Sequence, residues 1–166
     1  MNKPAFFHHQ GFTLAELLVA IVVIGILVAI AVPSLQSFLD KSRLVGAADN
    51  LLADMRYAQS ESLKQNQDIT VTFTTGANWS YTFNPPLGIT SNTSSASYKG
   101  TTLTTNTATL TFRAKRSTIS QAPSTGDLTA LTLTSAKASI LGLQLDANSH
   151  LTLCTGSAMG GYPTCP

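Results

Sequence analysis

The sequence has few charged residues and few residues of the kinds that usually carry out chemistry. Asp, Glu, Lys and Arg make up 11% of the 166 residues, and the formal net charge is +2. A net charge this small does not indicate binding to nucleic acid or to an anionic surface. Only two cysteines and three histidines are present, and they lack the spacing of a metal site. There is also no Gly-x-Ser-x-Gly turn and no Gly-rich phosphate loop. The composition therefore argues against an enzyme, a metal site and a cofactor.

The apolar residues are concentrated near the N-terminus. Between residues 12 and 32 the single charged side chain is that of Glu16. About 20 apolar residues in a helix cross a hydrocarbon core of ~30 Å, so residues 12–33 are predicted to form a membrane-spanning helix. A secretory signal peptide, which has a shorter apolar region, is the alternative.

Glu16 requires an explanation, because an acid at mid-bilayer costs on the order of 2.5–3.5 kcal/mol and usually has a function. No cation lies within its own helical turns. Cleavage between Gly11 and Phe12 would create an α-amine about one helical turn before Glu16, where it could meet a carboxylate of a neighbouring copy. The alternative is that Glu16 snorkels to the headgroups near the start of the helix.

The stretch GFTLAELLVAIVVIGILVAIAVP, residues 11–33, resembles the class III signal of type IV pilins and type II secretion pseudopilins. The resemblance implies that a prepilin peptidase removes the leader, residues 1–11, and methylates the amine of Phe12. It also implies that Glu16 recognises this amine on an adjacent subunit. The implied partners are other pilin subunits, the peptidase and inner-membrane lipid. The implied location is the inner membrane, with the head, residues 34–166, in the periplasm before it enters a filament.

After Pro33 the apolar residues follow a helical period up to residue 66. They form one broad stripe of Phe38, Leu44, Val45, Ala48, Leu51, Leu52, Met55 and Ala58. This stripe predicts an amphipathic helix, residues 34–66, that docks on a core. Pro33 removes an intrahelical hydrogen bond and is expected to bend the helix.

Beyond Asn66 the period changes to two, which is typical of strands. The segments DITVTFT (68–74) and WSYTF (79–83) predict a hairpin. Residues 90–107 are interpreted as a surface loop or a weak edge strand, and further strands are predicted at 108–112, 128–134, 139–145 and 150–154. Strands that follow one long helix indicate the α+β class. We therefore expect an antiparallel sheet from residues 67–166 packed on the amphipathic half of the helix, which agrees with the pilin fold that the resemblance implies.

Cys154 and Cys165 lie close to the C-terminus. An even cysteine count in an exported chain favours a disulfide between them, and two free buried thiols are the alternative. The tail between them is either a contact surface for partner subunits or an inert staple on the last strand.

The segment LLADMRYAQSESLKQNQDITVTF, residues 51–73, resembles the GspH/FimT branch of minor pilins and pseudopilins, as do LTFRAKRST and LGLQLDANSHLTLC. Some members of that branch bind DNA through a Gly-Arg-x-Arg-like motif, but the matching residues 148–151 contain no arginine. Arg113, Lys115 and Arg116 remain candidate phosphate contacts, although a cluster this small is more often a solvated strand end.

Four hypotheses follow from the sequence. The first is a minor pilin of a type IV pilus, and the second is a GspH-like pseudopilin of a type II secretion system. The third is a pilus-associated subunit that binds DNA, which the missing arginines do not favour. The fourth is a membrane-anchored periplasmic domain whose leader resembles a prepilin leader by chance.

Overall fold

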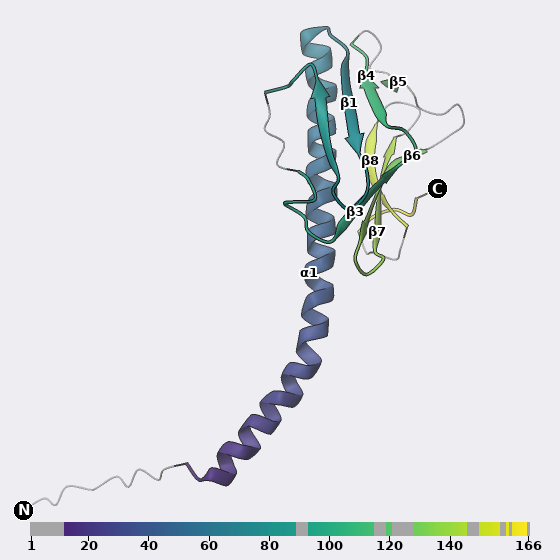
Figure 1. Ribbon diagram of the computed structural model, residues 1–166. Helices are drawn as coiled ribbons and strands as arrows, with labels where there is room; N and C mark the ends of the chain where they lie inside the picture. Colours follow the sequence, from purple (N-terminus) through teal and green to yellow (C-terminus); the bar gives the residue numbers. More distant parts are fainter. Residues whose placement is uncertain are drawn as a thin grey trace, which may run out of the picture. The chain divides into compact units, whose positions relative to one another are not determined.

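The chain consists of one long helix followed by short strands. The computed structural model describes residues 12–88, 93–114, 119–120, 128–145, 150–156, 159 and 161–165 (Figure 1). The chain divides into two compact units, Met1–Ser37 and Phe38–Pro166. Helix α1, Leu14–Gln65, contributes to both, and each unit is described by itself.

The first unit contains the N-terminal part of α1. Its most apolar 18-residue window has a mean hydropathy of 3.0, and none of it is buried. By length and composition this part of the helix is sufficient to cross a membrane. Pro33 lies inside the helix, and the Ser37 hydroxyl donates to the carbonyl of Ser34 at 2.8 Å. The bend at Pro33 stays a prediction.

In the second unit, the described strands form two antiparallel sheets, whereas the sequence analysis anticipated one. The first sheet has the order β2-β1-β4-β5 and the second has the order β3-β6-β7-β8. The strands are β1 Ile69–Thr74, β2 Ser80–Asn84, β3 Thr101–Thr105, β4 Thr109–Phe112, β5 Ile119–Ser120, β6 Leu128–Ser135, β7 Ile140–Leu145 and β8 Leu151–Thr155. The α+β class is confirmed.

The predicted positions of the strands are more accurate than the predicted number of sheets. The β1–β2 hairpin is confirmed, and β4, β6, β7 and β8 lie within one residue of their predicted ends. Residues 90–107 contain β3, which lies at the edge of the second sheet and pairs with β6. Strand β5 was not predicted. The single-sheet prediction was wrong because a period of two identifies a strand without identifying the strand it pairs with.

The core lies between the second half of α1 and the two sheets. The helix buries Leu44, Ala47, Ala48, Leu51, Met55, Ala58 and Ser62. The strands contribute alternate residues to the same cluster, such as Ile69, Val71, Leu110, Phe112, Leu131, Leu133, Leu141 and Leu143, and Trp79 is its largest fully buried side chain. Figure 1 shows this half of α1 alongside the strands.

The predicted stripe on the helix needs one correction. Phe38 is 67% exposed, and Val45 and Leu52 are only partly buried. The buried face begins at Leu44 because that is the first helical position at which strands cover the side chain. Phe38 keeps the helical spacing of the stripe but has no sheet opposite it.

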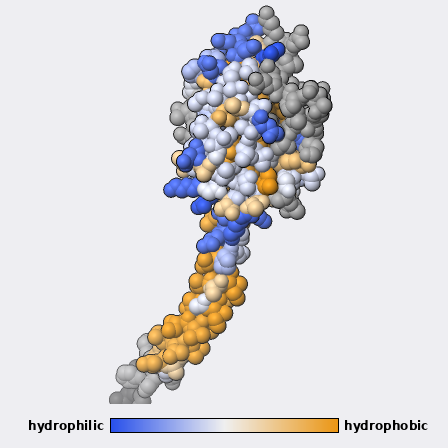
Figure 2. Space-filling model, turned by 45° about the vertical axis from the view of Figure 1, so that its right-hand side comes forward, coloured by the Kyte–Doolittle hydropathy of each residue, from blue (hydrophilic) through white to orange (hydrophobic). Residues whose placement is uncertain are grey.

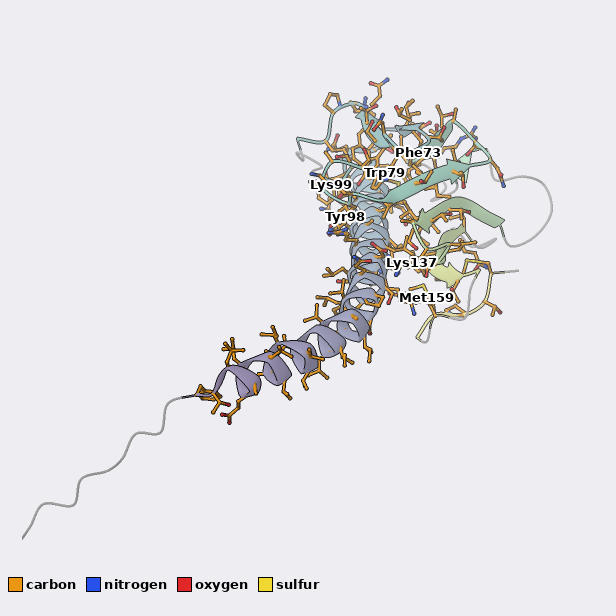
Figure 3. The ribbon with its side chains drawn as sticks, turned by 60° about the horizontal axis from the view of Figure 1, so that its bottom comes forward. Phe73, Trp79, Tyr98, Lys99, Lys137 and Met159 are labelled. Atoms are coloured by element: carbon orange, nitrogen blue, oxygen red, sulfur yellow. A yellow bond between two sulfur atoms is a disulfide. The ribbon has the colours of Figure 1, made fainter. Side chains whose placement is uncertain are left out.

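Polar side chains attach α1 to both sheets. The Tyr81 hydroxyl on β2 donates to the Asp54 carboxylate, and the Arg56 guanidinium donates to the carbonyl of Leu151 on β8 at 2.9 Å. In addition, Asn50 donates to the hydroxyl of Tyr98, whose ring lies against Gly46 of α1 (Figure 3). The helix is therefore held by hydrogen bonds as well as by its apolar face.

The buried face of α1 predicts a sharp contrast between two leucines. Leu51 is 1% exposed and Leu63 is 47% exposed. Leu51→Ala should lower the free energy of unfolding by about 3 kcal/mol, because it removes buried methyl groups and leaves a cavity. Leu63→Ala should change it by less than about 0.5 kcal/mol. Urea denaturation of the two variants in detergent measures both values, and equal losses would contradict this core.

Candidate assembly site

The residues next to Glu16 explain its position in the first turn of α1. Thr13 precedes the helix, and its hydroxyl accepts a hydrogen bond from the main-chain N–H of Glu16 at 3.2 Å. Its carbonyl accepts the N–H of Leu17 at 3.1 Å. Thr-x-x-Glu is the pattern of a helix capping box, and an acid in the first turn is stabilised by the helix dipole. This role of Thr13 was not predicted, although the four-residue pattern of Thr13 to Glu16 indicates it.

Of the two residues that flank the predicted cleavage position, the structure describes one, Phe12. Phe12 lies just before the cap, and its side chain is 79% exposed. Gly11 and the rest of the leader lie outside the described residues. The roles of Gly11, Phe12, Glu16 and Pro33 in processing and assembly stay predictions.

The N-terminal part of α1 presents a large apolar surface. Its large apolar side chains are all exposed, as Figure 2 shows by the orange band along the helix. They are Leu14, Leu17, Leu18, Val19, Ile21, Val22, Val23, Ile24, Ile26, Leu27, Val28, Ile30, Val32 and Leu35. An apolar patch of this size marks a surface that contacts lipid or other protein.

The C-terminal cysteines form a disulfide, as predicted. The Cys154–Cys165 sulfur atoms are 2.06 Å apart, and Cys154 is fully buried at the end of β8. Between them, Met159 and Tyr162 pack against the core cluster (Met159 is labelled in Figure 3).

The basic residues are only partly described. Arg113 follows β4 and is exposed, whereas Lys115 and Arg116 lie outside the described residues. Next to Arg113, the N–H of Ala114 donates to the Asp68 carboxylate at 3.0 Å. The carboxylate of Asp68 therefore lies close to the main chain next to Arg113, the first of the three basic residues. Contact of these residues with phosphate stays a prediction.

The remaining candidates for chemistry are sparse. His150 is exposed, and Asp146, which the strand pattern placed on the same face, lies outside the described residues. Within the part of the chain that the structure describes, there is no group of three or more His, Cys, Asp and Glu residues that could hold a metal ion.

Two family comparisons bear on the identity of the chain. Residues 47–158 match the family model of the type II transport protein GspH, which covers more than half of the chain. The chain belongs to the GspH family. Residues 7–32 of this GspH-family protein also match the prokaryotic N-terminal methylation motif. No curated protein and no solved structure matches it.

The two matches confirm the resemblance to the type IV pilin and pseudopilin superfamily and to its GspH-like branch. They support a minor pilin or pseudopilin, a structural subunit that assembles with other pilin subunits. The methylation motif and the apolar helix fit a GspH-family protein that is anchored in the inner membrane.

Tyr162 gives the C-terminal segment a dependence on pH. Burial raises the pKa of its phenol, and the negative charge of Asp49 on α1 raises it further. Because the folded protein holds this proton more tightly than the unfolded chain, the resulting stabilisation is complete below the ordinary tyrosine pKa of about 10 and is lost as the pH rises above it.

This dependence can be measured by comparing two tyrosines. Between about pH 9 and about pH 11, the parent protein should lose more stability than Tyr162→Phe, which has no phenol proton at this position to lose. Tyr57→Phe, at a more exposed tyrosine, should behave like the parent. Urea midpoints at the two pH values provide the test, and an identical alkaline loss in all three proteins would contradict it.

Proposed function

We propose that this chain is a minor subunit of a type IV pilus that is made as a membrane-anchored precursor and then built into the filament. One observation carries the proposal. The N-terminal methylation motif continues directly into a helix whose apolar side chains are exposed and whose first turn carries a single acid. This part of the chain needs a lipid or protein environment, whereas the GspH-family head has a core of its own.

In this proposal, prepilin peptidase cuts after Gly11 and methylates the new amine of Phe12. Thr13 supports the choice of site, because a cut before Phe12 leaves the hydroxyl that caps the helix in place. In this proposal the leader, which carries Lys3, stays in the cytoplasm and the head emerges in the periplasm. The disulfide fits that oxidising compartment.

During assembly, in this proposal, the amine of Phe12 on one subunit pairs with Glu16 of a neighbouring subunit. A carboxylate and an amine about 4 Å apart attract each other by about 4 kcal/mol at an effective dielectric constant of 20. This is comparable to the cost of about 2.5–3.5 kcal/mol for an acid within a membrane. An amine from a neighbouring subunit therefore offsets the burial of Glu16, while the surrounding apolar side chains pack against other helices.

A second candidate is a minor pseudopilin of a type II secretion system. The name of the matching family, type II transport protein GspH, favours it. Both candidates use the same processing and the same pairing of Glu16, so the phenotype of a deletion separates them. Loss of surface pili with normal protein secretion supports the pilus, and the reverse result supports the secretion system.

The role of Glu16 can be tested with an uncharged residue of the same shape. Glu16→Gln should reduce the subunit in sheared filaments by roughly tenfold or more, because the neutral amide loses the attraction to the amine. Immunoblots of filament and membrane fractions measure this ratio. Glu61→Gln is the matched control, because Glu61 pairs within α1 with Lys64 at 2.8 Å. Normal incorporation of Glu16→Gln would exclude the pairing.

The cleavage site can be read directly from the mature protein. Mass spectrometry should find an N-terminal peptide that begins at Phe12 and carries one additional methyl group on its amine. Any other N-terminus would refute the processing step, and with it the source of the cation for Glu16.

A further inference from the structure

Strand β8 is the last strand in the order of the second sheet, so one of its sides faces away from the pairing with β7. The register sets which groups face outward. The N–H of Gly156 donates to the carbonyl of Ile140 at 3.2 Å, and Leu143 lies opposite Leu153. Since hydrogen-bonded and non-bonded pairs alternate in an antiparallel ladder, the main-chain groups of Leu151, Leu153 and Thr155 point outward.

Both ends of this outer side are covered, and by different parts of the chain. At one end, the Arg56 guanidinium donates to the carbonyl of Leu151 at 2.9 Å. At the other end, the N–H of Thr155 donates to the carbonyl of Pro163 at 2.7 Å, and its carbonyl accepts the N–H of Cys165 at 3.0 Å. The C-terminal tail, residues 156–165, of which 156, 159 and 161–165 are described, thus meets β8 in a one-residue parallel bridge between Thr155 and Thr164.

The tail has few means of holding this position by itself. Its sequence, GSAMGGYPTC, contains three glycines and no charged residue. Met159 and Tyr162 provide apolar contacts, and the disulfide between Cys154 and Cys165 provides the covalent attachment. Because a glycine-rich segment loses much backbone entropy when it is ordered, the covalent link through the disulfide is the main constraint on the tail.

We propose that the disulfide-closed tail guards the open edge of β8, and that reduction of the disulfide exposes this edge for pairing with β8 of a second copy of the chain. In the reducing step, a dithiol transfers two electrons to the Cys154–Cys165 disulfide. The sulfur–sulfur bond breaks, each cysteine sulfur takes one proton, and the dithiol closes to its own disulfide.

The composition of β8 explains why its edge needs a guard. Its sequence, LTLCT, contains no charge and no proline, the two features with which edge strands usually oppose pairing. It also suits a second copy of itself. Antiparallel pairing about Leu153 places that residue opposite its equivalent, and a two-fold axis then repeats each contact. Thr155 lies opposite Leu151, whose carbonyl can accept the N–H of the second copy with the lone pair that Arg56 leaves.

Hydrogen exchange on the full chain in detergent tests the release of the tail. Addition of dithiothreitol should accelerate exchange of the Thr155 amide by roughly tenfold or more, because its acceptor on the tail leaves. The Leu103 amide, which donates to the carbonyl of Gly76 at 3.2 Å far from the disulfide in the sequence, is the control and should not change. Cys165→Ser should give the same result without a reductant.

Light scattering of the same samples tests the pairing. The reduced protein, with dithiothreitol kept present to prevent new disulfides, should have twice the protein mass of the oxidised protein. Thr152→Lys, at an exposed position of β8, should abolish this increase while Thr155 still exchanges rapidly, because a charge on an edge strand opposes pairing. Thr104→Lys, on the opposite edge strand β3, is the matched control and should still pair.

Three results would overturn the proposal. Unchanged exchange at Thr155 would mean that the tail stays in place without the disulfide. Rapid exchange at Thr155 without an increase in mass would mean that the exposed edge does not pair with a second copy. Acceleration at Leu103 as well would mean that the disulfide supports the whole head and does not guard one edge.

Discussion

The fold of the head depends on one contact, the burial of a single face of α1 against two sheets at once. Leu44, Leu51 and Met55 on this face are almost completely buried. The sheets form through separate pairings, and an isolated bridge between Gly76 and Leu103 joins them. The helix is therefore their common support. Its Asp54 accepts a hydrogen bond from Tyr81 of one sheet, and its Arg56 donates one to Leu151 of the other.

The N-terminal part of α1 differs from the part that packs in the head. There, apolar side chains cover the exposed surface, and one acid lies in the first turn. The Thr13 cap gives the segment a defined start, and the helix dipole favours the carboxylate of Glu16 in the first turn. In our proposal for assembly, the α-amine of a neighbouring subunit pairs with Glu16, a residue that the helix dipole already favours in the first turn.

The C-terminal tail shows how a small sheet with little charge can protect its edge. Strand β8 has no lysine or proline to oppose pairing, and the chain covers it with its own last residues. The disulfide holds this cover in place covalently, because it joins Cys154 of β8 to Cys165, whose N–H donates to the carbonyl of Thr155. Two cysteines near the C-terminus thus influence a strand edge that the period-two pattern alone does not reveal.

Features that depend on neighbouring residues could be predicted from the sequence alone. These include the apolar helix with its acid, the positions of most strands, the pairing of two lone cysteines and the family, because periodicity and motifs are local properties of the chain. Tertiary structure decided that there are two sheets, that Phe38 stays exposed and that the tail pairs with Thr155. These features depend on contacts between distant residues, and an alternation of apolar and polar side chains is compatible with many partners.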